Sequence, residues 1–202
     1  MANPVSLSEL EEDLLTELFN LGVGNAAASL STMVKQEIKL SVPEIEFLTI
    51  TELANKLGGD KTLCSVSQIV SGPFNAQSML LFPEENSIDI VRKLLGEELP
   101  EETVTELQNE AFSEIGNIVL NACIGSFSAA LDEEFKLDLP VFELAKPSDL
   151  FNLSKNRNET ALFIRINLTL SASEITGYMA FLMGTLSLEQ LKDVLAKMLS
   201  RL

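Results

Sequence analysis

Apolar and polar positions follow two different periods along this chain, and the periods predict helices and strands in a regular order. Within residues 7–36, apolar side chains recur three or four positions apart, as on one face of a helix. The apolar positions are Leu10, Leu14, Leu18, Leu21 and Ala26 to Leu30. Ser6 or Ser8, each followed three residues later by a glutamate, can cap the start of this helix.

Shorter apolar runs, bounded by proline, glycine and serine, predict the remaining elements of the first half. The predicted strands are 38–42, 44–50, 62–70 and 74–82, and the predicted helices are 51–57 and 86–96. The first two strands lie on either side of Pro43, and the helix over 86–96 is amphipathic and closed by Gly96.

The same order returns in the second half. A long helix is predicted at 104–131, strands at 134–139, 141–145, 160–170 and 175–183, a loop with one helical turn at 147–159, and a final helix at 187–199. The bridge over 99–102 is too short for a free linker, so we expect the halves 1–98 and 99–202 to pack together as one domain. The predicted fold class is α/β with two layers: an internally duplicated unit whose long helices pack on a mostly antiparallel sheet.

A polar motif occurs once in each predicted long helix, and each position of the second copy lies 97 residues after its counterpart in the first. Each copy contains an acid, then Glu, then Asn, and a proline after 22 intervening residues. The first copy is Asp13, Glu17, Asn20 and Pro43, and the second copy is Glu110, Glu114, Asn117 and Pro140. One copy alone is compatible with a solvated helix face, but two copies at one common shift indicate a duplicated unit that carries one site twice.

The spacing of the motif places its acids and its amide on one side of the helix. With about 100° of rotation per residue, they fall within about 60° of one another, at the edge of the apolar face where a partner could reach them. A carboxylate can pair with a cation or accept a proton, and an amide can hold a water through both a donor and an acceptor. The pair suits a hydrolase that positions a water, and it is poorly suited to building a metal site alone.

The composition narrows the chemistry. The absence of histidine removes Ser-His-Asp and Cys-His machinery together with the commonest transition-metal ligand. The chain also lacks the G-x-x-x-x-G-K-[ST] loop of an NTPase. With 14 basic and 30 acidic residues, its net charge of −16 favours solubility and argues against nucleic acid and anionic lipid as partners. Any hydrolysis must then rely on carboxylates, amides or groups that the substrate brings.

We expect a cytoplasmic protein without membrane insertion. The first residues lack a basic region followed by an apolar stretch, and no apolar run approaches the ~20 residues that span a bilayer. Cys64 and Cys123 lie inside apolar segments of different halves, and we expect reduced core thiols there instead of a disulfide. Gly22 and Gly24 weaken a helix interior, which predicts a close approach of another helix, such as that of the second copy.

The residues around both motifs carry a family resemblance. ELFNLGVGNAAASLSTMV contains Glu17 and Asn20, and SEIGNIVLNACIGSFSAAL contains Glu114 and Asn117. These segments closely resemble the two active-site helices of CheC-type chemotaxis phosphatases, which belong to the CheC/CheX/FliY family. The resemblance runs through nearly the whole chain, and two intact motifs without an added flagellar-switch domain favour the CheC type.

The resemblance implies an enzyme that hydrolyses the aspartyl phosphate of a CheY-like receiver domain in chemotaxis signalling. By analogy, Asn20 and Asn117 would orient the attacking water. Glu17 and Glu114 would pair with the active-site lysine of the receiver. Mg2+ would arrive with the phosphorylated receiver, so the chain is expected to need no cofactor and no metal site of its own.

The resemblance also implies supporting roles and leaves alternatives open. Asp13 and Glu110 would support docking, and Pro43 and Pro140 complete the family signature as supporting residues. The residue before the first asparagine is Phe19 where the second copy has glycine, so equal activity of the two sites stays open. The alternatives are a non-catalytic adaptor that binds a receiver or the receptor deamidase CheD, and an interaction domain with an unrelated partner.

Overall fold

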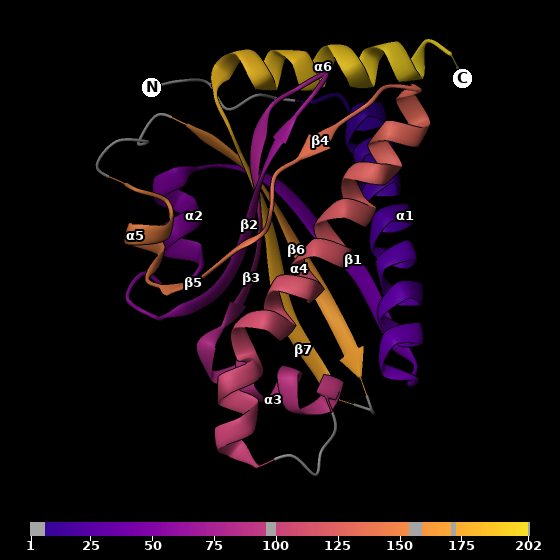
Figure 1. Ribbon diagram of the computed structural model, residues 1–202. Coiled ribbons are helices and arrows are strands. Elements are labelled where there is room, and N and C mark those ends of the chain that lie inside the picture. Colours follow the sequence, from indigo (N-terminus) through magenta and orange to yellow (C-terminus); the bar gives the residue numbers. More distant parts are fainter. Residues whose placement is uncertain (1–6, 96–99, 154–158, 171–172, 202) are drawn as a thin grey trace.

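The computed structural model (Figure 1) describes residues 7–95, 100–153, 159–170 and 173–201. Its first long helix, α1, spans Glu9–Val34 and begins with a reciprocal capping box. The backbone N–H of Ser8 donates to Glu11 Oε2 at 2.7 Å, and the Ser8 hydroxyl accepts from the Glu11 N–H at 3.4 Å. The cap predicted at Ser8 is therefore confirmed, while Ser6 and Gly96 lie outside the described residues.

The other elements follow the predicted order closely. The remaining helices are α2 (Ile50–Lys56), α3 (Glu84–Leu95), α4 (Glu101–Leu131), α5 (Pro147–Leu150) and α6 (Thr185–Leu199). The strands are β1 (Ile38–Thr49), β2 (Leu63–Ser71), β3 (Ala76–Pro83), β4 (Lys136–Leu137), β5 (Val141–Ala145), β6 (Thr160–Leu170) and β7 (Ser173–Met183).

Within the described residues, the strands form one seven-stranded sheet in the order β1-β6-β7-β3-β2-β4, and β5 also pairs with β2. Every strand pair is antiparallel. The sheet interleaves the early and late strands, because β1 pairs with β6 while β4 and β5 pair with β2. In the centre, Met79 of β3 pairs with Ala180 of β7, which stands 101 positions later. The predicted fold class is confirmed, and the division into halves at residues 98 and 99 stays a prediction.

The two faces of the sheet carry different layers (Figure 1). The long helices α1 and α4 cover one face, where the larger hydrophobic core lies. The short helices α2 and α5 cover part of the opposite face over a smaller core that includes Leu53, Phe151 and Phe163. The two motif helices therefore share one layer and pack on a common sheet.

The structure corrects three details of the sequence analysis. The strands predicted on either side of Pro43 are one continuous strand, β1, whose pairing with β6 shifts register between Ser41 and Glu44. The strand predicted at 134–139 shrinks to the two residues of β4. Leu10 and Leu21, predicted on the apolar face of α1, are 66% and 53% exposed.

The error at Leu10 and Leu21 has a packing cause. Helix α1 buries an arc that runs through Leu15, Phe19 and Val23, because it must contact both the sheet and α4. The leucine row lies at the border of that arc, and Leu21 lines an open groove between α1 and α4.

Helix α4 is the one described segment long and apolar enough to cross a bilayer by length and composition, over Glu102–Leu131. Within the protein, 44% of its most apolar window is buried. Phe112, Ile115 and Phe127 of α4 are each 1% exposed, so its apolar side is used by the hydrophobic core.

Candidate functional site

The first motif copy lies on the outward side of α1. Asp13, Glu17 and Asn20 are all exposed, whereas Leu15 and Phe19 beside them are each 1% exposed. The helical repeat therefore separates a polar stripe from the buried arc, as the motif spacing predicts. Within the described residues, the side chain of Asn20 makes no hydrogen bond, so both its donor and its acceptor can meet a partner.

The second motif copy has a different environment. Glu110 and Glu114 of α4 are exposed, but Asn117 is only partly exposed. Gly116, immediately before Asn117, lies directly against β2: a β-carbon added to Gly116 would stand 2.4 Å from Val66 Cγ1. The helix can approach the sheet this closely only because residue 116 has no side chain. Asn117 is thereby brought within reach of the polar residue Gln68 in the same strand.

Two amide side chains hold Asn117. The Oδ1 atom of Asn117 accepts from Gln68 Nε2 at 3.3 Å and from Asn121 Nδ2 at 2.6 Å. Asn121 Nδ2 also donates to the backbone oxygen of Asn117, at 2.6 Å. Gln68 is 3% exposed, so the amide of Asn117 is anchored to the interior of the sheet.

The same glutamine connects the two ends of the second motif. Gln68 Nε2 donates to the backbone oxygen of Asp138 at 3.0 Å, and the N–H of Asp138 donates to the Ile69 oxygen at 3.0 Å. Asp138 lies two residues before Pro140, in the connection between β4 and β5. The structure thus brings the Pro140 segment and Asn117 to a common partner, Gln68. Pro43 of the first copy is exposed and lies at the register shift of β1.

The first motif copy packs differently because Phe19 stands where the second copy has Gly116. Its ring packs in the core, 5.3 Å from the ring centroids of both Phe127 and Phe181, and it lines the same apolar pocket as Leu162. It therefore does not crowd the surface next to Asn20. Phe19 acts instead as a spacer between α1 and the sheet, at the position where Gly116 lets α4 approach.

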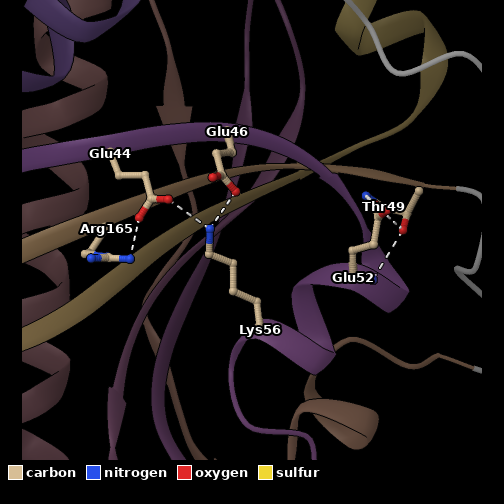
Figure 2. A network of polar contacts seen from close by, with 6 residues as sticks. All are labelled: Glu44, Glu46, Thr49, Glu52, Lys56 and Arg165. Atoms are coloured by element: carbon tan, nitrogen blue, oxygen red, sulfur yellow. Dashed lines mark hydrogen bonds and ion pairs between the residues drawn. The ribbon is translucent and has the colours of Figure 1, made fainter.

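A separate network of ion pairs lies on the opposite face of the sheet (Figure 2). Lys56 of α2 contacts Glu44 Oε1 at 3.0 Å and Glu46 Oε2 at 2.6 Å, and its Nζ lies 4.7 Å from the Phe163 ring centroid. Arg165 Nη2 forms an ion pair with Glu44 Oε2 at 2.6 Å. The hydrogen bond from Lys56 is the main cause that lowers the pKa of Glu44. These charges join α2 to β1 and β6 and are not part of either motif.

The acids and the asparagine of each motif form an acid–amide stripe along one side of α1 or α4. The sequence predicted both stripes but not the roles of Gln68 and Asn121. Asn121 stands one helical turn after Asn117, which is a visible signal. Gln68 stands in the predicted strand 62–70, and the corresponding signal is a polar residue between two apolar residues of the same strand face, Val66 and Val70, which are both buried in the structure. In the described ranges, no three or more Cys, Asp or Glu side chains gather as a group that could hold a metal ion.

The fold and the motif together define a class: internally repeated α/β proteins with an acid–amide stripe on each of two central helices. Residues 10–46 match the CheC-like family. The chain is 27% identical over 140 residues to the CheY-P phosphatase CheC of Bacillus subtilis, covering 66% of this chain and 64% of that protein. It is 31% identical over 104 residues to the flagellar motor switch phosphatase FliY of B. subtilis, covering 50% of this chain and 28% of that protein. The resemblance to the CheC/CheX/FliY family is confirmed, and the matched region spans less than two thirds of either relative.

Solved structures share the fold at low sequence identity. Thermotoga maritima FliY superposes with a TM-score of 0.75 at 16% identity, covering 96% of this chain and 100% of that chain. The FliM middle domain of H. pylori gives a TM-score of 0.61 at 12% identity, with 93% and 99% covered. The CheX–CheY–BeF3–Mg2+ complex of Borrelia burgdorferi gives 0.54 at 18% identity, with 83% and 97% covered.

Proposed function

We propose that this protein is a phosphatase that hydrolyses the aspartyl phosphate of a CheY-like receiver domain in chemotaxis signalling. The observation that carries the proposal is the doubled acid–amide stripe, which presents Glu17 with Asn20 and Glu114 with Asn117 on two core helices. Two relatives are named as phosphatases, one of them for CheY-P, which supports the same activity here. A protein of the same fold has been solved in complex with CheY, BeF3 and Mg2+.

The chemistry needs little covalent participation from the chain. Water attacks the phosphorus, the bond between phosphorus and the aspartyl oxygen breaks, and the products are the free carboxylate, inorganic phosphate and one proton. Phosphoryl transfer passes through a loose transition state, so that positioning and electrostatics supply most of the catalysis. The amide of Asn20 or Asn117 would position the water, and the Mg2+ and lysine would belong to the receiver.

The glutamates would serve docking and orientation. Glu17 and Glu114 stand one turn before their asparagines on exposed helix surface. An exposed carboxylate can reach the receiver lysine without first breaking an internal ion pair, since neither glutamate has an ion pair within the described residues. Asp13 and Glu110 extend each stripe by one more turn and would add charge to the docking surface.

The decay of a 32P-labelled CheY-type receiver in Mg2+ buffer tests the proposal. The wild-type chain should accelerate the decay, and the double variant Asn20→Ala with Asn117→Ala should abolish the acceleration. The variant should still unfold cooperatively, at a somewhat lower melting temperature because Asn117→Ala removes the acceptor for Gln68 and Asn121. Retention of full turnover by the double variant would exclude the assigned residues.

A matched control uses other asparagines of the same helices. Asn25 of α1 and Asn109 of α4 are exposed and lie off the motif stripes. The double variant Asn25→Ala with Asn109→Ala removes two amides but leaves both stripes intact, so its rate should match that of wild type. Equal losses in the two double variants would mean that helix integrity, not the motif, sets the rate.

The adaptor alternative makes a different prediction in the same assay. A binding module would associate with the phosphorylated receiver and leave its phosphate lifetime unchanged. The partnership with CheD stays a prediction from the resemblance, and an association assay with purified CheD would test it.

A further inference from the structure

The two motif asparagines differ in how their side chains are held, and Gln68 is the cause. Gln68 Nε2 donates to a backbone oxygen, that of Asp138, at 3.0 Å. A backbone carbonyl can only accept, so this bond fixes which end of the Gln68 amide is the nitrogen. The second N–H of the same nitrogen then faces Asn117 Oδ1, at 3.3 Å.

The orientation of Asn117 follows from that of Gln68. An amide oxygen has two lone pairs, and Asn117 Oδ1 accepts from both Gln68 and Asn121. Its Nδ2 group is therefore the end left to meet a partner. A bound water can accept from Nδ2 with one lone pair and keep its other lone pair directed at phosphorus. The anchored amide thus presents a fixed donor before any receiver arrives.

In the part of the chain that the structure describes, no side chain anchors Asn20 in this way. Gln68 pairs with Ser78, and the residue 101 positions after Ser78 is Met179, which pairs with Ile164. Ile164, which is fully buried, thus takes the place of Gln68 in the second hairpin. The motif shift of 97 likewise places Gly24 of α1 where α4 has Asn121. Asn20 therefore lacks the counterparts of both donors that hold Asn117.

We propose that Gln68 is a positioning residue that presets Asn117 for reaction, and that the two sites are unequal because Asn20 has no equivalent support. The proposal rests on the proposed phosphatase function for its catalytic consequence. Its structural part, a restrained Asn117 amide beside a freely rotating Asn20 amide, stands independently of any activity.

The kinetic test isolates each site before Gln68 is changed. In an Asn20→Ala background only the second site works, and Gln68→Met, which keeps the length of the side chain, should lower kcat roughly fivefold, the factor associated with one neutral hydrogen bond. KM should hold, because Gln68 is buried and does not touch the receiver. In an Asn117→Ala background the same substitution should leave kcat within twofold. An equal effect in both backgrounds, or an effect on KM alone, would overturn the proposal.

A second readout separates this proposal from the phosphatase itself. Nitrogen-15 relaxation of the side-chain amides, assigned with the two alanine variants, should show Asn117 as rigid and Asn20 as mobile in the free protein. Gln68→Met should make the Asn117 side chain more mobile. Asn121→Ala removes the other donor to Asn117 at an exposed position and should have the same effect, so it replaces Gln68→Met as the test if that variant does not fold. Equal mobility of Asn20 and Asn117 in the wild type would overturn the proposal. If the Asn20→Ala and Asn117→Ala proteins are both inactive but the two asparagines show the expected mobilities, the phosphatase function is refuted and the positioning of Asn117 by Gln68 is retained.

Discussion

Gly22 of α1 lies directly against the backbone of Cys123 in α4. A β-carbon added to Gly22 would stand 2.6 Å from Cys123 Cα and 3.1 Å from both the Cys123 nitrogen and Ser126 Oγ. Two of these three neighbours are backbone atoms, which cannot move aside as a flexible side chain can. The two motif helices are therefore in contact through their backbones at this point, which confirms the close approach predicted at Gly22; the same prediction is wrong for Gly24, which has open space around it.

This contact predicts opposite effects for two neighbouring glycines. Gly22→Ala should lower the free energy of unfolding by about 1–3 kcal/mol, the typical range for overpacking a core. Among the described residues, no atom outside the adjoining stretch of α1 lies within 4 Å of a β-carbon added at Gly24. Gly24→Ala should therefore raise the free energy of unfolding by about 0.5–1 kcal/mol, because alanine favours the helix. Urea unfolding of both variants tests the pair. Equal destabilisation would show that the close approach at Gly22 is not what limits residue size there.

Much of this architecture could be predicted from the sequence because its signals are local. The alternation of apolar residues places most elements to within a few residues, and the repeated motif indicates that the two long helices are equivalent. The pattern failed where distant contacts decide burial. Leu10 and Leu21 have helical spacing, but the partners of α1 select Leu15 and Phe19 for the core instead.

The site divides in the same way. The common direction of the acids and asparagines in each stripe could be predicted from the sequence, because a helix fixes the relative directions of side chains within two turns. Gln68 escapes such reasoning because it stands 49 positions from Asn117 and meets it only after α4 packs on β2. The glycine that permits this meeting, Gly116, is visible in the sequence, but nothing in its neighbours indicates that Val66 is the residue it contacts.

Gly116 provides a prediction that couples packing to activity. Gly116→Ala would place a β-carbon 2.4 Å from Val66 Cγ1, so α4 must move away from β2 and carry Asn117 away from Gln68. The variant should lose stability by about 1–3 kcal/mol, and in an Asn20→Ala background it should also slow dephosphorylation. Gly125→Ala, with open space around the new atom, is the matched control and should retain both. Unchanged thermal unfolding of Gly116→Ala would contradict the close packing.

The ion pairs around Lys56 predict a stability that depends on pH. Burial alone would lower the pKa of Lys56, but its hydrogen bonds with Glu46 and Glu44 outweigh burial and raise the pKa. The pKa of Glu44 is lowered from its ordinary value of 4.5, mainly by the hydrogen bond from Lys56. A lowered carboxyl pKa contributes stability that is present above pH 4.5 and lost as the pH falls through the folded-state pKa.

Lys56→Met should therefore cost about 1 kcal/mol at pH 7, given that a partly exposed pair contributes about 0.2–1 kcal/mol and two pairs are removed. The difference between variant and wild type should shrink as the pH is lowered below 4.5 toward 3, because the Glu44 carboxylate becomes protonated in both proteins. Lys61→Met is the matched control, since Lys61 is 66% exposed and pairs with Glu85 at 3.6 Å. If the difference in free energy of unfolding between Lys56→Met and wild type does not depend on pH, the effect of the substitution comes from packing on Phe163 and not from charge.

Chemical labelling of the two cysteines should report on global unfolding of the protein. Cys64 and Cys123 are free and buried, which confirms the expected pair of reduced core thiols. Burial raises the pKa of Cys123 to about 12, and burial, with a smaller contribution from Glu84, raises that of Cys64. Because the thiolate is the reactive form, an aromatic disulfide reagent should label neither thiol at pH 8 in the native protein and both in urea. Cys123 packs behind Gly22, so Gly22→Ala should speed its labelling in native buffer, whereas Gly24→Ala should slow it or leave it unchanged. Rapid labelling of the wild-type protein without denaturant would contradict the burial of both thiols.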